Sequence, residues 1–371
     1  MAPSDQSAEH PDYLSKQLIT YIGNKRSLLG HIDKAVFRVK ERLGKSRLRI
    51  FDAFAGSGVV SRYFKRHAER LVSNDLENFA AVAGRCFLRN HSSVDLSRLR
   101  KVVDDLNGRA EMTEFPPGFI EKLYAPADES DIAATDRVFY TRDNASRLDN
   151  YRRLLEGVDP AYRDLLLGPL LSEASVHANT SGVFKGFYKD RATGIGKFGG
   201  SNGDALVRIK GRIELDVPVL SRFECDVEVH QQDANTLAGQ LRGFDLAYFD
   251  PPYNQHPYGS NYFMLNLLVD YQKPELISTV SGIPTDWQRS DYNVRSRCLS
   301  RLAELIRAVD ASFVLVSFND EGFIAPSEMR QLLTQIGKLE VIEIPYNTFR
   351  GSRNLRGRSI HVTEQMFLVE K

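Results

Sequence analysis

The hydrophobic positions along the first part of the chain alternate between helical and strand spacing. Residues 27–43 carry leucine, isoleucine and valine three or four positions apart, which is typical of an amphipathic helix, and Gly44 follows as a stop signal. Short apolar runs predict strands over 48–53 and 71–73, and helices are predicted to begin at Val59 and Leu76. Strands that alternate with helices favour an α/β protein with a mostly parallel sheet.

The same alternation returns in the last third of the chain. Strands are predicted over 244–249, 312–317, 339–344 and 362–369, helices over 298–309 and 326–336, and a loop followed by a helix over 254–269. The last two strands follow each other without a helix between them. This pattern predicts that the sheet ends in an antiparallel hairpin.

Between these halves the pattern changes. Residues 91–222 are rich in charged and turn residues, and we predict two helices there, over 145–155 and 161–178. We therefore predict three parts: residues 1–90, an insertion over 91–222, and residues 223–371, with the first and last forming one sheet. The polar, proline-containing stretch 1–13 is predicted to be a loose tail.

The apolar run 244–249 ends in Asp250-Pro251-Pro252-Tyr253, which suits the binding of an exocyclic amine. The prolines lack N–H groups, so nearby carbonyls can accept hydrogen bonds without a competing donor. An amino group on a nucleobase can donate one hydrogen to Asp250 and the other to the Pro251 carbonyl, which frees its lone pair, while Tyr253 offers a face for stacking. An ordinary turn is the alternative interpretation, because Asp-Pro often opens turns.

A second candidate site is the glycine turn in Phe54-Ala55-Gly56-Ser57-Gly58, which follows the predicted strand 48–53. No Lys-Ser or Lys-Thr pair follows, which argues against a Walker loop, and Ser61 replaces the third glycine of a dinucleotide motif. Asp75 lies about 20 residues on, where an acidic residue meets ribose hydroxyls. The pair indicates a nucleoside without a pyrophosphate, and S-adenosylmethionine fits. Asp75 can equally cap the helix beginning at Leu76.

Composition sets outer limits on function. The net charge is +1, so any affinity for nucleic acid must come from local basic patches. The 3 cysteines form no C-x-x-C pair, and we expect neither disulfides nor a metal. No long apolar segment or signal peptide is evident, so we expect a cytoplasmic protein without a membrane segment.

Two basic stretches are candidates for binding nucleic acid. In residues 179–212, Lys185 and Lys189 stand among glycines and aromatic residues. Residues 346–361 contain four arginines and no acidic residue: Arg350, Arg353, Arg356 and Arg358. Such stretches can follow a phosphate chain and stack on bases, although solvated loops can have the same composition.

Taken together, these motifs resemble those of the Dam-like DNA adenine-N6 methyltransferases. Phe54 to Gly58 is similar to the F-x-G-x-G cofactor motif, Asp250 to Tyr253 to the D-P-P-Y catalytic motif, and Tyr21 to Lys25 to the amino-terminal Y/W-x-G-x-K motif, in the family's order. The resemblance implies a Rossmann-like class I methyltransferase sheet that binds S-adenosylmethionine. Residues 91–222 would be the inserted target-recognition region.

The resemblance also implies roles for individual residues. The base would be held by Asp250, Pro251, Pro252 and Tyr253. The cofactor would be contacted by Tyr21, Lys25, Asp52, Phe54, Gly56, Gly58, Asp75 and Asp233. For Tyr21 the alternative is a core anchor, and for Asp52 and Phe54 it is strand packing.

The sequence thus predicts a site-specific methyltransferase that flips an adenine out of double-stranded DNA and methylates N6 without a metal. Cytosine-N4 methylation remains an alternative, although those enzymes more often have serine at the position of Asp250. A noncatalytic DNA-binding subunit of a modification system is another. A protein-glutamine enzyme would usually have asparagine there. The expected partner is duplex DNA, with a cognate restriction endonuclease as a further candidate and the protein acting as a monomer.

Overall fold

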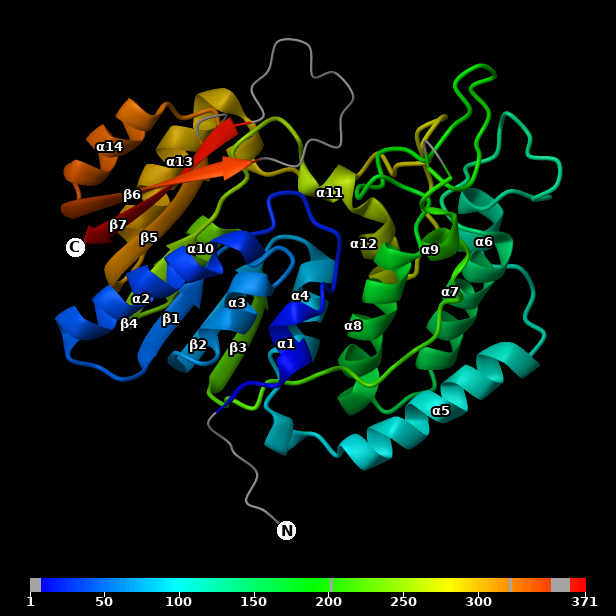
Figure 1. Ribbon diagram of the computed structural model, residues 1–371, viewed down its shortest axis with the longest axis horizontal. Helices are drawn as coiled ribbons and strands as arrows, with labels where there is room; N and C mark the ends of the chain where they lie inside the picture. Colours follow the sequence, from blue (N-terminus) through cyan, green and yellow to red (C-terminus); the bar gives the residue numbers. More distant parts are fainter. Residues whose placement is uncertain (1–7, 201–202, 320–321, 348–360) are drawn as a thin grey trace.

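The computed structural model describes residues 8–200, 203–319, 322–347 and 361–371. It contains a 7-stranded sheet in the order β3-β2-β1-β4-β5-β7-β6 (Figure 1). The strands are β1 (Leu48–Asp52), β2 (Ala68–Asp75), β3 (Asp226–Gln231), β4 (Phe244–Phe249), β5 (Ala311–Asn319), β6 (Lys338–Asn347) and β7 (His361–Glu370). The strands β1 to β5 pair in parallel, and β7 is antiparallel to both β5 and β6. The predicted fold class and the final hairpin are confirmed.

Helices cover both faces of the sheet because neighbouring strand residues point to opposite sides. In β1, Ile50 packs into the core under α2 (Leu29–Leu43) and α3 (Val59–Phe64). Phe51 packs into the opposite core, under α10 (Ala234–Gln240), α13 (Arg295–Ala308) and α14 (Pro326–Thr334). All residues of β4 are buried, as expected for a central strand covered on both faces.

The predicted helices and strands outside the middle region correspond to observed ones, with boundaries that differ by a few residues. The helix over 29–43 ends where Gly44 adopts a φ of 64°, the left-handed conformation that terminates helices. The sequence analysis did not predict β3. This strand lies at the edge of the sheet and is largely half-exposed, so its apolar residues, Val227 and Val229, give too short a pattern.

The prediction of a loose tail over 1–13 is wrong for its last residues. Tyr13 lies in α1 (Pro11–Ser15), is fully buried, and donates a hydrogen bond from its hydroxyl to the Phe87 carbonyl at 2.7 Å. The Arg62 guanidinium lies over its ring at 4.7 Å. Glu9 accepts hydrogen bonds from the Ser221 hydroxyl and the Arg222 N–H. One buried aromatic ring fixes this polar segment to the sheet domain.

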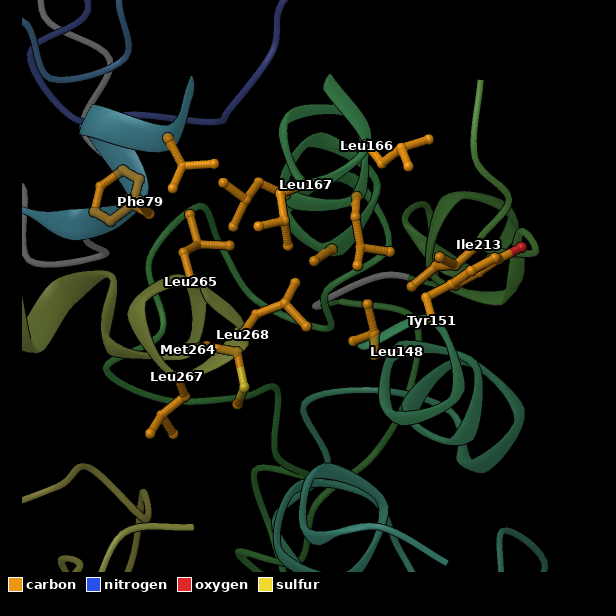
Figure 2. Packing of buried hydrophobic residues seen from close by; sticks show 14 of the residues in the cluster. Phe79, Leu148, Tyr151, Leu166, Leu167, Ile213, Met264, Leu265, Leu267 and Leu268 are labelled. Carbon is orange, nitrogen blue, oxygen red and sulfur yellow. The ribbon is translucent and has the colours of Figure 1, made fainter. Parts of the chain in front are cut away.

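The middle of the chain forms helices beside the sheet (Figure 1): α5 (Leu96–Met112), α6 (Phe119–Tyr124), α7 (Arg142–Leu155), α8 (Pro160–Val176) and α9 (Leu206–Lys210). Their core continues into α4 (Asn78–Phe87) and α12 (Phe263–Asp270). Figure 2 shows Phe79 of α4, Leu167 of α8 and Leu265 of α12 converging. The division at residues 91 and 222 stays a prediction, but the middle region shares one hydrophobic core with helices outside it.

The close contact between α8 and α4 gives a stability prediction. A Cβ added at Gly168 in α8 would lie 2.5 Å from the Cys86 sulfur, whereas one added at Gly108 in α5 would meet nothing within 4 Å. Gly168→Ala should therefore lower the free energy of unfolding by about 1–3 kcal/mol through overpacking. Gly108→Ala should raise it by about 0.5–1 kcal/mol, because alanine favours a helix. Urea denaturation measures both, and stabilisation by both changes would contradict this packing.

Candidate active site

A pocket opens at the carboxyl ends of the central strands. Phe54 and Gly56 follow β1, Asp75 ends β2, and Asp250 follows β4, and all four line the pocket. Strand β1 pairs with β2 on one side and β4 on the other, so the chain order reverses at this point. Open α/β sheets bind ligands at such a switch point. The fold therefore brings the two sequence motifs into one cavity.

The glycine turn after β1 depends on its glycines. Gly56 and Gly58 have φ values of 53° and 74°, which lie in the left-handed region. A Cβ on Gly56 would also lie 2.9 Å from Cε1 of Tyr21. The Tyr21 ring thus lies directly against the turn, and a larger residue at position 56 would displace it. Gly58 precedes α3 and is not among the residues that line the pocket.

Asp75 ties the glycine turn to the end of β2. Its carboxylate accepts the Gly56 N–H at 2.7 Å and the Glu77 N–H at 2.9 Å. Helix α4 begins at Asn78 with Glu77 in the capping position, so the prediction that Asp75 caps a helix from Leu76 is wrong. Burial raises the pKa of Asp75, while these backbone hydrogen bonds oppose the rise.

Stacked tyrosines hold the amino-terminal motif, which begins at Tyr21, against the pocket. The Tyr21 ring stacks on Tyr258 of α11 (Tyr258–Asn261) at 5.0 Å and on Tyr262 at 4.7 Å. The Ile22 N–H donates to the Tyr262 hydroxyl at 2.7 Å, and the Ile22 carbonyl accepts from the Tyr258 hydroxyl at 3.3 Å. Tyr21 therefore both anchors its segment and lines the pocket.

Asp250 is largely buried and ion-paired. Its Oδ1 lies 3.1 Å from Nζ of Lys25, and the same Nζ lies 3.0 Å from Oε1 of Glu364 in β7. Burial raises the pKa of Asp250 to about 6, and the nearby Lys25 ammonium limits the rise. For Lys25, burial would lower the pKa, but Asp250 together with Tyr253 and Glu364 outweighs it and holds the pKa above the usual value.

The other residues of the Asp-Pro-Pro-Tyr motif have different surroundings. Pro252 lines the pocket, whereas Pro251 is buried and, like Tyr253, is not among the lining residues. The Tyr253 ring packs against Phe318 with centroids 5.4 Å apart, and the Lys25 ammonium lies 5.4 Å from its centroid. The role of Tyr253 in stacking on a base stays a prediction.

Asp52 lies behind the pocket rather than in its wall. It is fully buried and accepts a hydrogen bond from the Ser61 hydroxyl at 2.6 Å. That hydroxyl also lies 2.8 Å from the hydroxyl of Ser73 in β2. Burial raises the pKa of Asp52 to about 7. These contacts join β1, α3 and β2, which agrees with the packing alternative, while contact with the cofactor stays a prediction.

Asp233 and Phe54 lie at another part of the pocket wall. The Asp233 carboxylate caps α10 by accepting the Thr236 N–H at 3.0 Å, and it pairs with Arg301 at 3.2 Å. The Phe54 ring packs edge-on against Tyr292 at 5.1 Å. Asp233 thus has a structural role beside any contact with a ligand.

Several lining residues were missed by the sequence analysis. Asn74, next to Asp75, exchanges hydrogen bonds with the backbone of Gln232 and donates to the Ala53 carbonyl, so it joins three strand ends. Glu77 accepts from the Asn266 amide at 2.6 Å, and burial raises its pKa to about 7. No motif marks the segment that closes the pocket with Gln288, Ser290, Tyr292 and Asn293.

The predicted DNA-binding residues are only partly described. Lys185 and Lys189 are exposed. Arg208, from the same basic stretch, donates instead to the Val176 and Ala178 carbonyls, and Arg212 pairs with Glu111, so these two arginines stabilise the fold. The four arginines predicted to bind phosphates, Arg350, Arg353, Arg356 and Arg358, lie outside the described residues.

No group of three or more His, Cys, Asp or Glu side chains is arranged to hold a metal ion in the described part of the chain. Among the described helices, none is long and apolar enough to span a membrane.

The sheet order and the site define a class I S-adenosylmethionine-dependent methyltransferase fold. Residues 21–331 match the D12 class N6 adenine-specific DNA methyltransferase family, and the chain belongs to this family. The match decides for adenine N6 over cytosine N4 and for an enzyme over a noncatalytic subunit.

Curated relatives agree with the family assignment. The chain is 27% identical to the type II methyltransferase M.NlaIII of Neisseria lactamica, over 94% of this chain and 100% of the relative. It is 28% identical to M.CviAII of Paramecium bursaria Chlorella virus 1, over 95% and 98%. The type II methyltransferase M.FokI of Planomicrobium okeanokoites is 25% identical over 95% of this chain but only 52% of the relative.

The burial of Asp52 predicts a pH effect on stability. Its pKa is about 7 in the folded protein against 3.8 for the free side chain, so the folded state holds its proton more tightly than the unfolded state. The contribution of Asp52 to the free energy of unfolding should therefore fall as pH rises from about 4 to about 7. The total loss is about 1.4 kcal/mol for each unit by which the two pKa values differ. Asp52→Asn removes this titration.

As pH rises from 5 to 8, the free energy of unfolding of Asp52→Asn should thus increase relative to that of the parent, whatever the difference between them at pH 5. Urea denaturation at several pH values measures both free energies. Their difference cancels the contributions of the other acidic groups, which the two proteins share. A difference that is independent of pH would contradict the account of Asp52.

Proposed function

We propose that the pocket binds S-adenosylmethionine and holds the N6 amine of a flipped adenine against Asp250. The observation that supports this proposal best is the convergence of Gly56, Asp75 and Asp250 in one cavity. Because the target amine lies within the base stack of duplex DNA, the base must leave the stack to reach this cavity.

The donors and acceptors of the pocket fit this cofactor. Asp75 and Glu77 offer carboxylate oxygens for ribose hydroxyls, and Phe54 and Tyr292 offer aromatic surface for the adenine. The buried carboxylate of Glu77 also favours a ligand with positive charge, since burial raises its pKa and a nearby cation would stabilise its ionised form. When bound, S-adenosylmethionine supplies an electrophilic methyl group on a sulfonium.

Asp250 would act by orienting and polarising the amine. Its carboxylate and the Pro251 carbonyl would accept the two N6 hydrogens, which makes the nitrogen lone pair available. The carboxylate must be ionised for this role, and Lys25 at 3.1 Å stabilises the ionised form. As the N–C bond forms, the bond from the methyl group to sulfur would break and leave a neutral thioether, and the methylated amine would then lose one of its protons to water. Catalysis of this kind depends mainly on orientation and electrostatics.

Contacts to the rest of the DNA are proposed from charge and position in the sequence. Lys185 and Lys189, together with Arg350, Arg353, Arg356 and Arg358, would bind phosphates, and the region 91–222 would read the target sequence. The type II relatives suggest a cognate restriction endonuclease as a functional partner. We propose that the enzyme acts as a cytoplasmic monomer.

The central test separates the role of Asp250 from that of Asp75. Asp250→Ala should abolish the formation of N6-methyladenine but leave cofactor binding nearly unchanged. Asp75→Asn should chiefly weaken cofactor binding, by about 1.5–3 kcal/mol if a charged hydrogen bond to the ribose is lost. Mass analysis of nucleosides after incubation of DNA with labelled cofactor measures the product, and calorimetry measures binding. Near-parental turnover by Asp250→Ala would refute the mechanism.

The stacking role of Tyr253 predicts a graded effect. Tyr253→Ala should lose about 1–3 kcal/mol of stacking on the flipped base, whereas Tyr253→Phe keeps an aromatic face and should lose much less. A fluorescent adenine analogue at the target position reports flipping. Equal fluorescence with the parent and with Tyr253→Ala would exclude the role.

A further inference from the structure

We propose that Glu364, in the last strand, is a positioning residue that holds Lys25 in place and thereby fixes the ionised carboxylate of Asp250. The proposal rests on the proposed function of Asp250. It concerns a residue beyond the matched family region, which ends at residue 331.

The geometry places one ammonium between two carboxylates. Nζ of Lys25 lies 3.1 Å from Oδ1 of Asp250 and 3.0 Å from Oε1 of Glu364. The side chains of Lys25 and Glu364 are 4% and 5% exposed, and that of Asp250 is 16% exposed toward the pocket. The buried ion pair with Glu364 therefore anchors Lys25, whose other partner, Asp250, lines the pocket.

Glu364 is itself fixed by the sheet. It stands on β7 opposite Asn319 of β5 and Ile344 of β6, and its Oε1 accepts the Ser317 hydroxyl at 3.0 Å. A side chain between two paired strands moves little, whereas lysine has a long flexible side chain. Glu364 thus gives Lys25 one rigid attachment point.

The Lys25 ammonium also interacts with two carboxylates at once, those of Asp250 and Glu364. Lys25 stabilises the ionised form of Asp250, whereas Glu364 is a like charge that makes ionisation of Asp250 harder. Among the described residues, the other titratable groups that interact with Asp250 are Asp52 at the end of β1 and the hydroxyls of Tyr248 and Tyr258. Removal of Lys25 and removal of the Glu364 charge should therefore shift the titration of Asp250 in opposite directions.

Two substitutions test these opposite shifts. Glu364→Gln keeps an acceptor oxygen for Lys25 but removes the charge, so the acidic limb of the kcat/KM profile should move to lower pH. Lys25→Met should move the same limb to higher pH by about 1–3 units, because a close opposite charge is lost. The profile of kcat/KM against pH reports groups of the free enzyme.

A matched control and a positioning readout complete the experiment. Glu343→Gln removes the same charge from the neighbouring strand, where Glu343 pairs with Arg330 and is 60% exposed, and it should leave the profile unchanged. Glu364→Ala should lower kcat on the pH plateau without a matching change in the KM for cofactor. Glu364→Gln should restore most of that kcat, because it can still hold Lys25.

The outcomes are decisive even if Lys25→Met folds poorly, since Glu364→Gln alone tests the direction of the shift. A Glu364→Gln profile with the parental midpoint, or one moved to higher pH, would overturn the proposal. So would an unchanged plateau in Glu364→Ala. Asp250→Ala is assayed in parallel: its inactivity at every pH would preserve the proposed function even if the Glu364 variants behave like the parent.

Discussion

The site depends on the cost of holding acidic side chains away from water at the carboxyl ends of three strands. Asp52, Asp75, Glu77 and Asp250 all have raised pKa values because they are buried. An uncompensated buried charge is expensive, so each needs partners. Ser61, backbone N–H groups, Asn266 and Lys25 supply them. The elements that contribute these partners are thereby drawn together around the pocket.

Strand order explains why this cluster can exist. Strand β1 lies between β2 and β4, so the segments that follow β1 and β4 leave the sheet in opposite directions. The cavity lies between these segments. The tyrosine stack around Tyr21 then closes the cavity with a segment from the start of the chain. The glycine turn and the Asp250 carboxylate thus line the same cavity.

Much of the fold was predictable because its signals are local. The apolar run 244–249 and the helix stop at Gly44 are visible in short windows of sequence, and residues from both motifs line one pocket. Features that depend on contacts between distant residues were not predictable. Glu364 carries no local signal, since its ion pair with Lys25 arises only when β7 pairs beside β5. The burial of Tyr13 likewise depends on Phe87.

The preference of the buried Glu77 carboxylate for a cationic cofactor can be measured directly. Calorimetry from pH 6 to pH 8 gives the affinities of S-adenosylmethionine, which carries a sulfonium, and of S-adenosylhomocysteine, which carries a neutral thioether. Their ratio cancels effects common to both ligands. As Glu77 ionises over this range, the ratio should rise in favour of S-adenosylmethionine. A ratio that stays constant or falls with pH would contradict the account.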